Sequence, residues 1–268
     1  MADLPTDIDD FKRRDLALLG RTKPVLTTGD AGPAVIIIHE IYGFTPTLAR
    51  FCRWVRDAGF RVYAPVLFGQ ADAGNPERVT VSRQLGLCIS REFSLFAAGK
   101  SSPVVEWLKD LARLAHRECG GRGVGAIGMC ITGNFALAMA VEPDVLAPVL
   151  AQPGLPSFKP AAIGVSEPDL AVLRGRIDRE GLLVRGYRFA GDTICRAARF
   201  ETLSRVLGKG FAGRTLPDSA GNPTGRKPPH SVFTTDLIDH AGEPTRAAVD
   251  EVIAFFRERL SSPTDAAG

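Results

Sequence analysis

The sequence predicts a doubly wound α/β fold, in which helices cover both faces of a mainly parallel sheet. Two observations lead to this fold class. Short apolar runs of strand length alternate with amphipathic helical segments along most of the 268 residues. The runs are also apolar without interruption, as is typical of strands that are buried on both faces. With 45% hydrophobic residues, the chain can build a full-sized core, and we expect one domain over residues 1–268.

The individual elements follow one another as repeated βα units. Residues 34–40 (AVIIIHE) form the first clear strand, and residues 47–60 form an amphipathic helix that ends at Gly59. A Ser cap with Pro at the first turn predicts another helix over residues 102–119. The remaining strands are expected at 61–68, 123–129, 145–154 and 181–192, and the remaining helices at 133–141, 167–180, 196–210 and 243–260.

Two segments lie outside this alternation. Residues 1–33 are expected to form an N-terminal extension with early strands. Residues 213–232 are rich in Gly and Pro and are expected to form one long loop. We prefer a loop to a linker between domains, because the roughly 40 residues that follow are too few for a typical domain.

Composition narrows the class of protein. The net charge is +3 and the basic residues are scattered, which argues against a nucleic-acid-binding stripe. The sequence lacks a membrane-length apolar run and the apolar core of a signal peptide. The five cysteines show no CxxC spacing and the four histidines form no cluster, so we expect reduced thiols, a cytoplasmic location and no metal site. The oligomeric state stays open.

The stretch GAIGMCITG, residues 125–133, places a cysteine where a predicted strand turns into a helix. Chemistry in parallel sheets collects at the carboxyl ends of strands. A nucleophile elbow holds its reactive side chain there on a tight turn, with small residues two positions to either side. Gly128 fits this pattern, whereas Thr132 stands where the second small residue belongs and Gly133 follows it. Cys130 is therefore either a nucleophile or a small buried core residue.

Three further features occur in the order of an α/β-hydrolase, which is nucleophile, acid, histidine. Asp192 ends a late strand in RFAGDTI, and His230 follows the long loop in PPHSVF. Glu40 ends an early strand and precedes a Gly-containing loop. In α/β-hydrolases that loop and the residue after the nucleophile supply the oxyanion hole, which predicts the backbone N–H groups of Ile41 and Ile131.

The chain resembles the dienelactone hydrolase family in the segments HEIYGF, YAPVLFG, GMCITG, AGDTI, HSVF and AAVDEVIAFF, which occur in that order. The resemblance implies an α/β-hydrolase fold and hydrolysis of a small ester or lactone without a cofactor. It also implies a nucleophilic Cys130, supported by His230 and Asp192, and a Glu40 that contacts the thiol. The family's prototype has an arginine shortly after the catalytic histidine that helps to hold a substrate carboxylate. The stretch HSVFTTD lacks it, so dienelactone itself is not the expected substrate.

Several residues have alternative interpretations. His240 competes with His230 as the general base, and the HSVF context favours His230. His39 is expected to point away from the site, because neighbouring strand residues face opposite sides. Arg83 and Arg91 either bind a substrate anion or are solvated surface residues.

The expected chemistry is acyl transfer to Cys130 followed by hydrolysis. A thiolate leaves more easily than an alkoxide, which favours activated esters, lactones or thioesters over amides. Three alternatives remain: acyl or thioester transfer on the same site, a ligand sensor that kept the fold, and a redox-sensing thiol. Turnover separates the enzymes from the sensor, and oxidation of Cys130 without hydrolase activity would identify the redox thiol.

Overall fold

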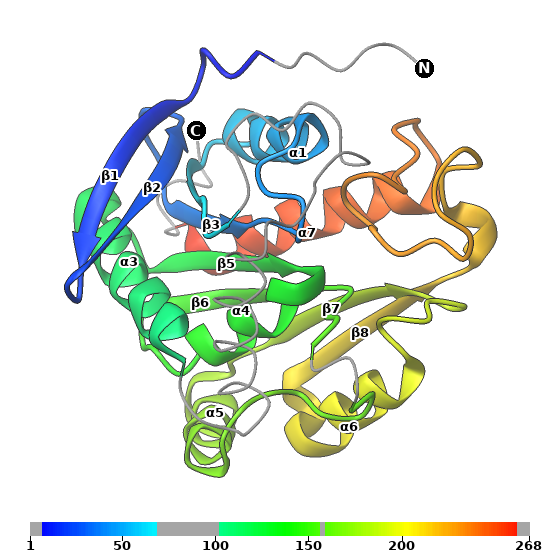
Figure 1. Cartoon of the computed structure of the whole chain (residues 1–268). Helices are drawn as coiled ribbons and strands as arrows, with labels where there is room; N and C mark the ends of the chain where they lie inside the picture. The colour runs from blue at the N-terminus through cyan, green and yellow to red at the C-terminus, as the bar shows by residue number, and fades with distance from the viewer. Residues whose placement is uncertain (1–6, 69–101, 156–158, 262–268) are drawn as a thin grey trace.

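The computed structural model describes residues 7–68, 102–155 and 159–261 (Figure 1). Within these ranges the strands form one eight-stranded sheet in the order β1-β2-β4-β3-β5-β6-β7-β8. The strands are β1 (Lys12–Leu18), β2 (Arg21–Thr28), β3 (Ala34–Ile38), β4 (Arg61–Pro65), β5 (Val124–Met129), β6 (Val145–Ala151), β7 (Val184–Phe189) and β8 (Phe211–Leu216). The pairs from β4 through β8 are parallel, whereas β1–β2 and β2–β4 are antiparallel. The predicted mainly parallel α/β fold is confirmed.

Helices cover both faces of this sheet, as the uninterrupted apolar strands predicted. They are α1 (Pro46–Asp57), α3 (Pro103–Cys119), α4 (Gly133–Met139), α5 (Glu167–Glu180), α6 (Ala197–Leu207) and α7 (Pro244–Leu260). Alternate residues of β3 enter different cores: Val35 and Ile37 pack in the core of α1 and α7, and Ile36 packs in the core of α3 to α6. Figure 1 shows the two groups of helices on opposite sides of the strands. Period-two alternation therefore fills both cores from one strand.

Strand register brings distant segments of the sequence to one edge of the sheet. Ile38 of β3 pairs with Gly128 of β5, and Met129 of β5 pairs with Ala151 of β6. The residues that follow these strands therefore emerge side by side at the carboxyl edge, where parallel sheets place their functional sites.

The structure differs from the expected loop over residues 213–232. Residues 213–216 complete β8, and the connection to α7 covers residues 217–243, which we call the histidine loop. The difference has a simple cause, since β8 is a short edge strand with one buried residue and no apolar run.

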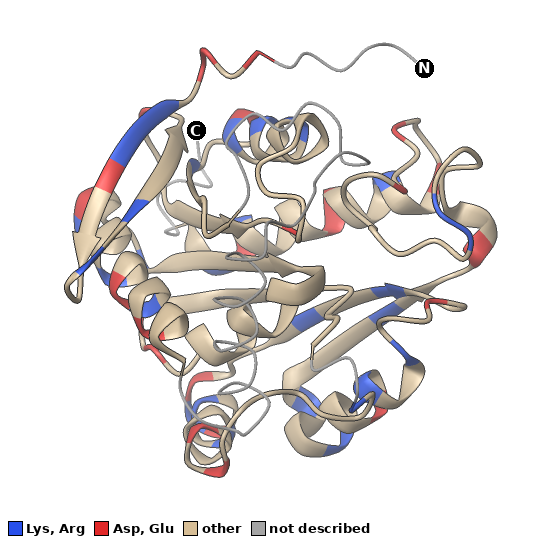
Figure 2. Cartoon of the chain, viewed as in Figure 1, with Lys and Arg blue, Asp and Glu red and all other residues tan. Residues whose placement is uncertain are grey.

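Charged residues are interspersed over the surface of the described elements (Figure 2). Among the described residues, none of the helices combines the length and the apolar character needed to span a bilayer.

Glu118, near the end of α3, connects the β1–β2 hairpin to the body of the sheet. The two terminal guanidinium nitrogens of Arg14 in β1 lie 2.6 and 2.7 Å from its carboxylate oxygens. The hydroxyl of Tyr63 in β4 donates a third hydrogen bond of 2.7 Å. The hydrogen bond from Arg14 is the main reason that the pKa of Glu118 is lowered from 4.5 to about 2.

This lowered pKa predicts acid sensitivity. Glu118 stabilises the fold above its unfolded pKa of 4.5, and the contribution is lost as the pH falls toward about 2. Urea denaturation between pH 6 and pH 2.5 should therefore show a steeper loss of unfolding free energy in the wild type than in Glu118→Gln. Parallel pH profiles for the two proteins would contradict the assignment.

Candidate active site

Cys130 follows the last residue of β5 and adopts a left-handed backbone, with φ of 56°. This conformation is unfavourable for a residue with a side chain and is typical of a nucleophile elbow. Two glycines make the turn possible. A Cβ atom on Gly128 would lie 2.1 Å from the carbonyl oxygen of Thr132, and one on Gly133 would lie 2.6 Å from Cα of Pro153. The second small residue is therefore needed at position 133, where α4 passes the segment after β6.

Thr132 occupies the position where the family pattern has a glycine, and its side chain fastens the turn. The hydroxyl oxygen accepts a hydrogen bond of 3.0 Å from the N–H of Met129. It also lies 3.0 Å from the carbonyl oxygen of His39, to which it can donate. Thr132 thereby connects the elbow to the end of β3.

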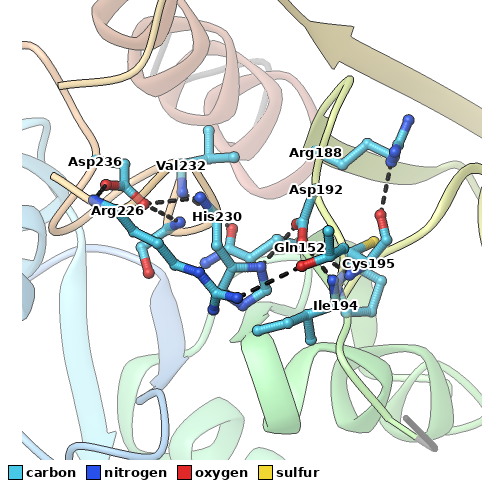
Figure 3. Close-up of polar contacts among 12 residues, drawn as sticks. Gln152, Arg188, Asp192, Ile194, Cys195, Arg226, His230, Val232 and Asp236 are labelled. Atoms are coloured by element: carbon cyan, nitrogen blue, oxygen red, sulfur yellow. Dashed lines mark hydrogen bonds and ion pairs between the residues drawn. The ribbon is translucent and has the colours of Figure 1, made fainter. Parts of the chain in front are cut away.

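His230 and Asp192 are in direct contact in the interior (Figure 3). Nδ1 of His230 lies 2.7 Å from Oδ2 of Asp192, and both side chains are buried. The other carboxylate oxygen accepts hydrogen bonds of 2.8 and 3.0 Å from the N–H groups of Ile194 and Cys195. These backbone donors fix Asp192, which in turn fixes the imidazole.

Cys130 lies on the remaining side of the imidazole. Nε2 of His230 is buried and makes no regular hydrogen bond to any residue in the described ranges. Burial alone would lower the pKa of His230, but its interactions with Asp192 and Cys130 outweigh burial and raise the pKa to about 10. Since Asp192 occupies Nδ1, Nε2 is the ring nitrogen left for the thiol of Cys130. The structure therefore brings these three predicted residues together.

A second buried aspartate, Asp236, holds the histidine loop (Figure 3). Its Oδ2 atom accepts hydrogen bonds of 2.7 and 2.9 Å from the N–H groups of His230 and Ser231. Its Oδ1 atom accepts one of 3.0 Å from the N–H of Arg226. We did not predict Asp236 from the sequence, where it stands as one of several loop aspartates.

Glu40 is buried among donors from two segments. Its Oε1 atom accepts hydrogen bonds of 2.8 Å from the side-chain amide of Gln152 and 2.9 Å from the hydroxyl of Thr234. Its Oε2 atom accepts one of 3.1 Å from Ser231. Burial raises the pKa of Glu40, and the positive charge of His230 opposes that rise. These hydrogen bonds go to Gln152, Thr234 and Ser231, and the contact with the thiol that the family resemblance implies stays a prediction.

The predicted oxyanion donors are the backbone N–H groups of Ile41 and Ile131. Ile41 directly follows Glu40 in the chain, and Ile131 directly follows Cys130. The carbonyl of Glu40 lies 2.6 Å from Nδ1 of His39. The N–H of Leu67 donates to Nε2 of His39 at 2.9 Å, which places the ring proton on Nδ1. His39 therefore fixes the peptide plane that contains the Ile41 N–H. Burial lowers the pKa of His39 to about 4, so the ring is neutral at pH 7.

His240, the alternative candidate for the base, does not join this group. His240 is exposed, and its Nδ1 atom lies 2.9 Å from the carbonyl oxygen of Ala241. Arg83 and Arg91 lie outside the described residues. Within the described ranges, no three His, Cys, Asp or Glu side chains are grouped so that they could hold a metal ion.

Replacing Asp236 by asparagine should loosen the histidine loop. An amide has one accepting oxygen in place of two, so at least one of the three N–H groups loses its buried partner. We expect Asp236→Asn to lower the unfolding free energy by about 1–3 kcal/mol in urea denaturation. Asp239→Asn, at a partly exposed position of the same loop, is the control. Equal losses in the two variants would contradict this role.

Comparison with known proteins agrees with the family that the sequence motifs resemble. The model of the dienelactone hydrolase family matches residues 22–168. Carboxymethylenebutenolidase 1 of Cupriavidus pinatubonensis is 31% identical over 119 residues, which are 43% of this chain and 48% of that protein. The match thus spans about half the length of this curated relative.

Solved structures share the fold over nearly the whole chain. The dienelactone hydrolase-like promiscuous phosphotriesterase P91 from metagenomic libraries has a TM-score of 0.62 at 19% identity, covering 94% of this chain and 98% of its own. A dienelactone hydrolase from Anabaena variabilis has a TM-score of 0.52 at 16% identity, covering 94% of this chain and 99% of its own. At these identities the similarity establishes the fold alone.

Proposed function

Because the chain belongs to the dienelactone hydrolase family, we propose that it hydrolyses a small ester or lactone through an acyl intermediate on Cys130. The observation that carries the proposal is the buried group of Cys130, His230 and Asp192. The cysteine stands on a left-handed turn at a strand end, and the imidazole is held by a 2.7 Å hydrogen bond to the aspartate. A nucleophile, a base and a group that orients the base are the parts that acyl transfer requires.

In the first step, the sulfur of Cys130 attacks the carbonyl carbon of the substrate. Nε2 of His230 takes the thiol proton and then gives it to the departing oxygen. Asp192 keeps the other ring proton on Nδ1 and stabilises the imidazolium. The interactions with Asp192 and Cys130 that raise the pKa of His230 also favour the imidazolium that forms when the thiol proton is transferred.

The negative oxygen of the tetrahedral intermediate is stabilised by the N–H groups of Ile41 and Ile131. One such donor contributes about 3 kcal/mol to the stabilisation of the transition state. The hydrogen bond from His39 to the Glu40 carbonyl preorganises one of the two donors.

In the second step, water attacks the acyl group and His230 accepts its proton. The thiolate leaves and takes this proton back from His230, and the cycle closes without a metal or an organic cofactor. Since a thiolate is a better leaving group than an alkoxide or an amide anion, the route suits activated esters, lactones and thioesters.

We expect Cys130→Ala to abolish hydrolysis of p-nitrophenyl acetate, because the variant has no nucleophile. The fold should survive, since the side chain is small and the turn depends on the glycines. Initial rates measured with circular dichroism as a fold check test this. A folded variant that keeps more than about a tenth of the wild-type rate would exclude Cys130 as the nucleophile.

Two matched variants test whether loss of any thiol or any imidazole would lower the rate. Cys119→Ala removes another thiol and His240→Ala another imidazole, and both should keep wild-type rates. Acylation of wild-type Cys130 without release of acid into water would indicate a transferase or a sensor on the same site.

Glu40 is proposed to limit the reactivity of the resting thiol. A buried negative charge near Cys130 and His230 opposes formation of a thiolate. We therefore expect Glu40→Gln to react faster with iodoacetamide than the wild type. Alkylation rates recorded from pH 5 to pH 9 test this expectation. An unchanged profile would mean that Glu40 acts only through its hydrogen bonds.

A further inference from the structure

Gln152 is the first residue after β6, and its side chain is fully buried. Both the nitrogen and the oxygen of its side-chain amide form hydrogen bonds. Its Nε2 atom donates the 2.8 Å hydrogen bond to Oε1 of Glu40. Its Oε1 atom accepts a hydrogen bond of 3.3 Å from the N–H of Val232. One side chain thus bridges the loop after β3 and the histidine loop, which it contacts two residues beyond His230; Figure 3 labels Gln152 and Val232.

The backbone of Gln152 is also unusual. Its φ of 35° lies in the left-handed region, which residues other than glycine rarely adopt. Its N–H donates a hydrogen bond of 2.7 Å to the carbonyl oxygen of Tyr187 in β7, so the left-handed residue is anchored to the sheet. Such strain persists only where surrounding contacts fix it, and it is concentrated at functional sites.

The segment that begins at Gln152 also contacts the elbow. The N–H of Gly154 donates a hydrogen bond of 2.8 Å to the carbonyl oxygen of Cys130. The end of β6 therefore touches the elbow, the Glu40 loop and the histidine loop. Gln152 makes the side-chain contacts to the two loops.

We propose that Gln152 is a positioning residue that holds the Glu40 loop and the histidine loop at the spacing that hydrolysis requires. A donor must face the carboxylate of Glu40 while an acceptor faces the N–H of Val232. At neutral pH an amide meets both demands, whereas a carboxylate cannot donate and a thioether does neither. The expected effect on catalysis rests on the proposed function, but the two hydrogen bonds can be tested without turnover.

Gln152→Met removes both hydrogen bonds at similar side-chain length. Amide hydrogen exchange at Val232 should accelerate by at least tenfold, since its acceptor is gone, and this readout does not depend on activity. The kcat for p-nitrophenyl acetate should fall about 10–100-fold with little change in KM, because misplacement by about 1 Å can cost 100-fold in rate. Unchanged exchange at Val232, or a kcat within about twofold of the wild type in a folded variant, would overturn the proposal.

Gln152→Glu keeps the acceptor for Val232 and places a second carboxylate against Glu40. Two carboxylates at this distance share one proton at low pH and repel each other once both ionise. The ratio of variant to wild-type kcat should therefore fall by about tenfold or more between pH 5.5 and pH 8.5, while Val232 stays protected at pH 5.5. A constant ratio would overturn the positioning role, even if Gln152→Met fails to fold.

Thr245→Val is the matched control for loss of a buried hydrogen bond. The Thr245 hydroxyl is buried and accepts a hydrogen bond of 3.0 Å from the N–H of Ile238, in the same loop region but apart from Glu40 and Gln152. It should leave exchange at Val232 and the pH dependence of kcat unchanged. Absence of hydrolysis in the wild type would reject the proposed function, whereas the exchange comparison would still decide whether Gln152 holds the histidine loop.

Discussion

The left-handed backbone of Cys130 is the constraint on which the candidate site depends. The turn places the thiol at the carboxyl edge of the sheet, and the space around it excludes any side chain on Gly128 or Gly133. The carbonyl of Cys130 accepts the N–H of Gly154, and the neighbouring Thr132 is tied to the end of β3. The strands on both sides of β5 therefore determine where the sulfur lies.

Around that turn, three buried carboxylates are satisfied by three hydrogen bonds each. Asp192 accepts from two backbone N–H groups and the imidazole, Asp236 from three backbone N–H groups, and Glu40 from three side chains. Burying a carboxylate is costly unless donors replace its water. The same donors fix the loops that carry His230 and Glu40, so the bonds that compensate for buried charge also define the geometry of the site.

The sequence predicted the parts of this molecule whose signal is local. Buried strands such as β3 and β5 are uninterrupted apolar runs, and the elbow is marked by Gly128 before Cys130. The order of Cys130, Asp192 and His230 along the chain was sufficient to suggest an α/β-hydrolase, and the fold and family are confirmed. Their contact in space follows from strand order, because parallel strands end at the same edge.

The sequence did not predict residues whose role depends on partners far away in the chain. Asp236 is important because three backbone N–H groups of the histidine loop donate hydrogen bonds to its carboxylate. Gln152 is important because its amide forms hydrogen bonds to both the Glu40 loop and the histidine loop. Neither pairing leaves a periodic or motif signal. The edge strand β8 was missed for another reason, since exposed edge residues need not be apolar. For Glu40, the family resemblance implied a contact with the thiol, whereas its three hydrogen-bond partners could be identified only from the structure.

The proposed mechanism requires Cys130 to carry the acyl group during turnover. With an activated ester such as p-nitrophenyl acetate, we expect acylation to be faster than hydrolysis of the acyl-enzyme, so that the intermediate accumulates. Acid quenching within the first turnover, followed by intact-mass measurement and peptide mapping, would test this directly. The mechanism predicts one acetyl group per chain, on the peptide that contains Cys130, decaying at the rate of steady-state turnover. Acetylation at another residue, or turnover without any acetyl group on Cys130, would contradict it.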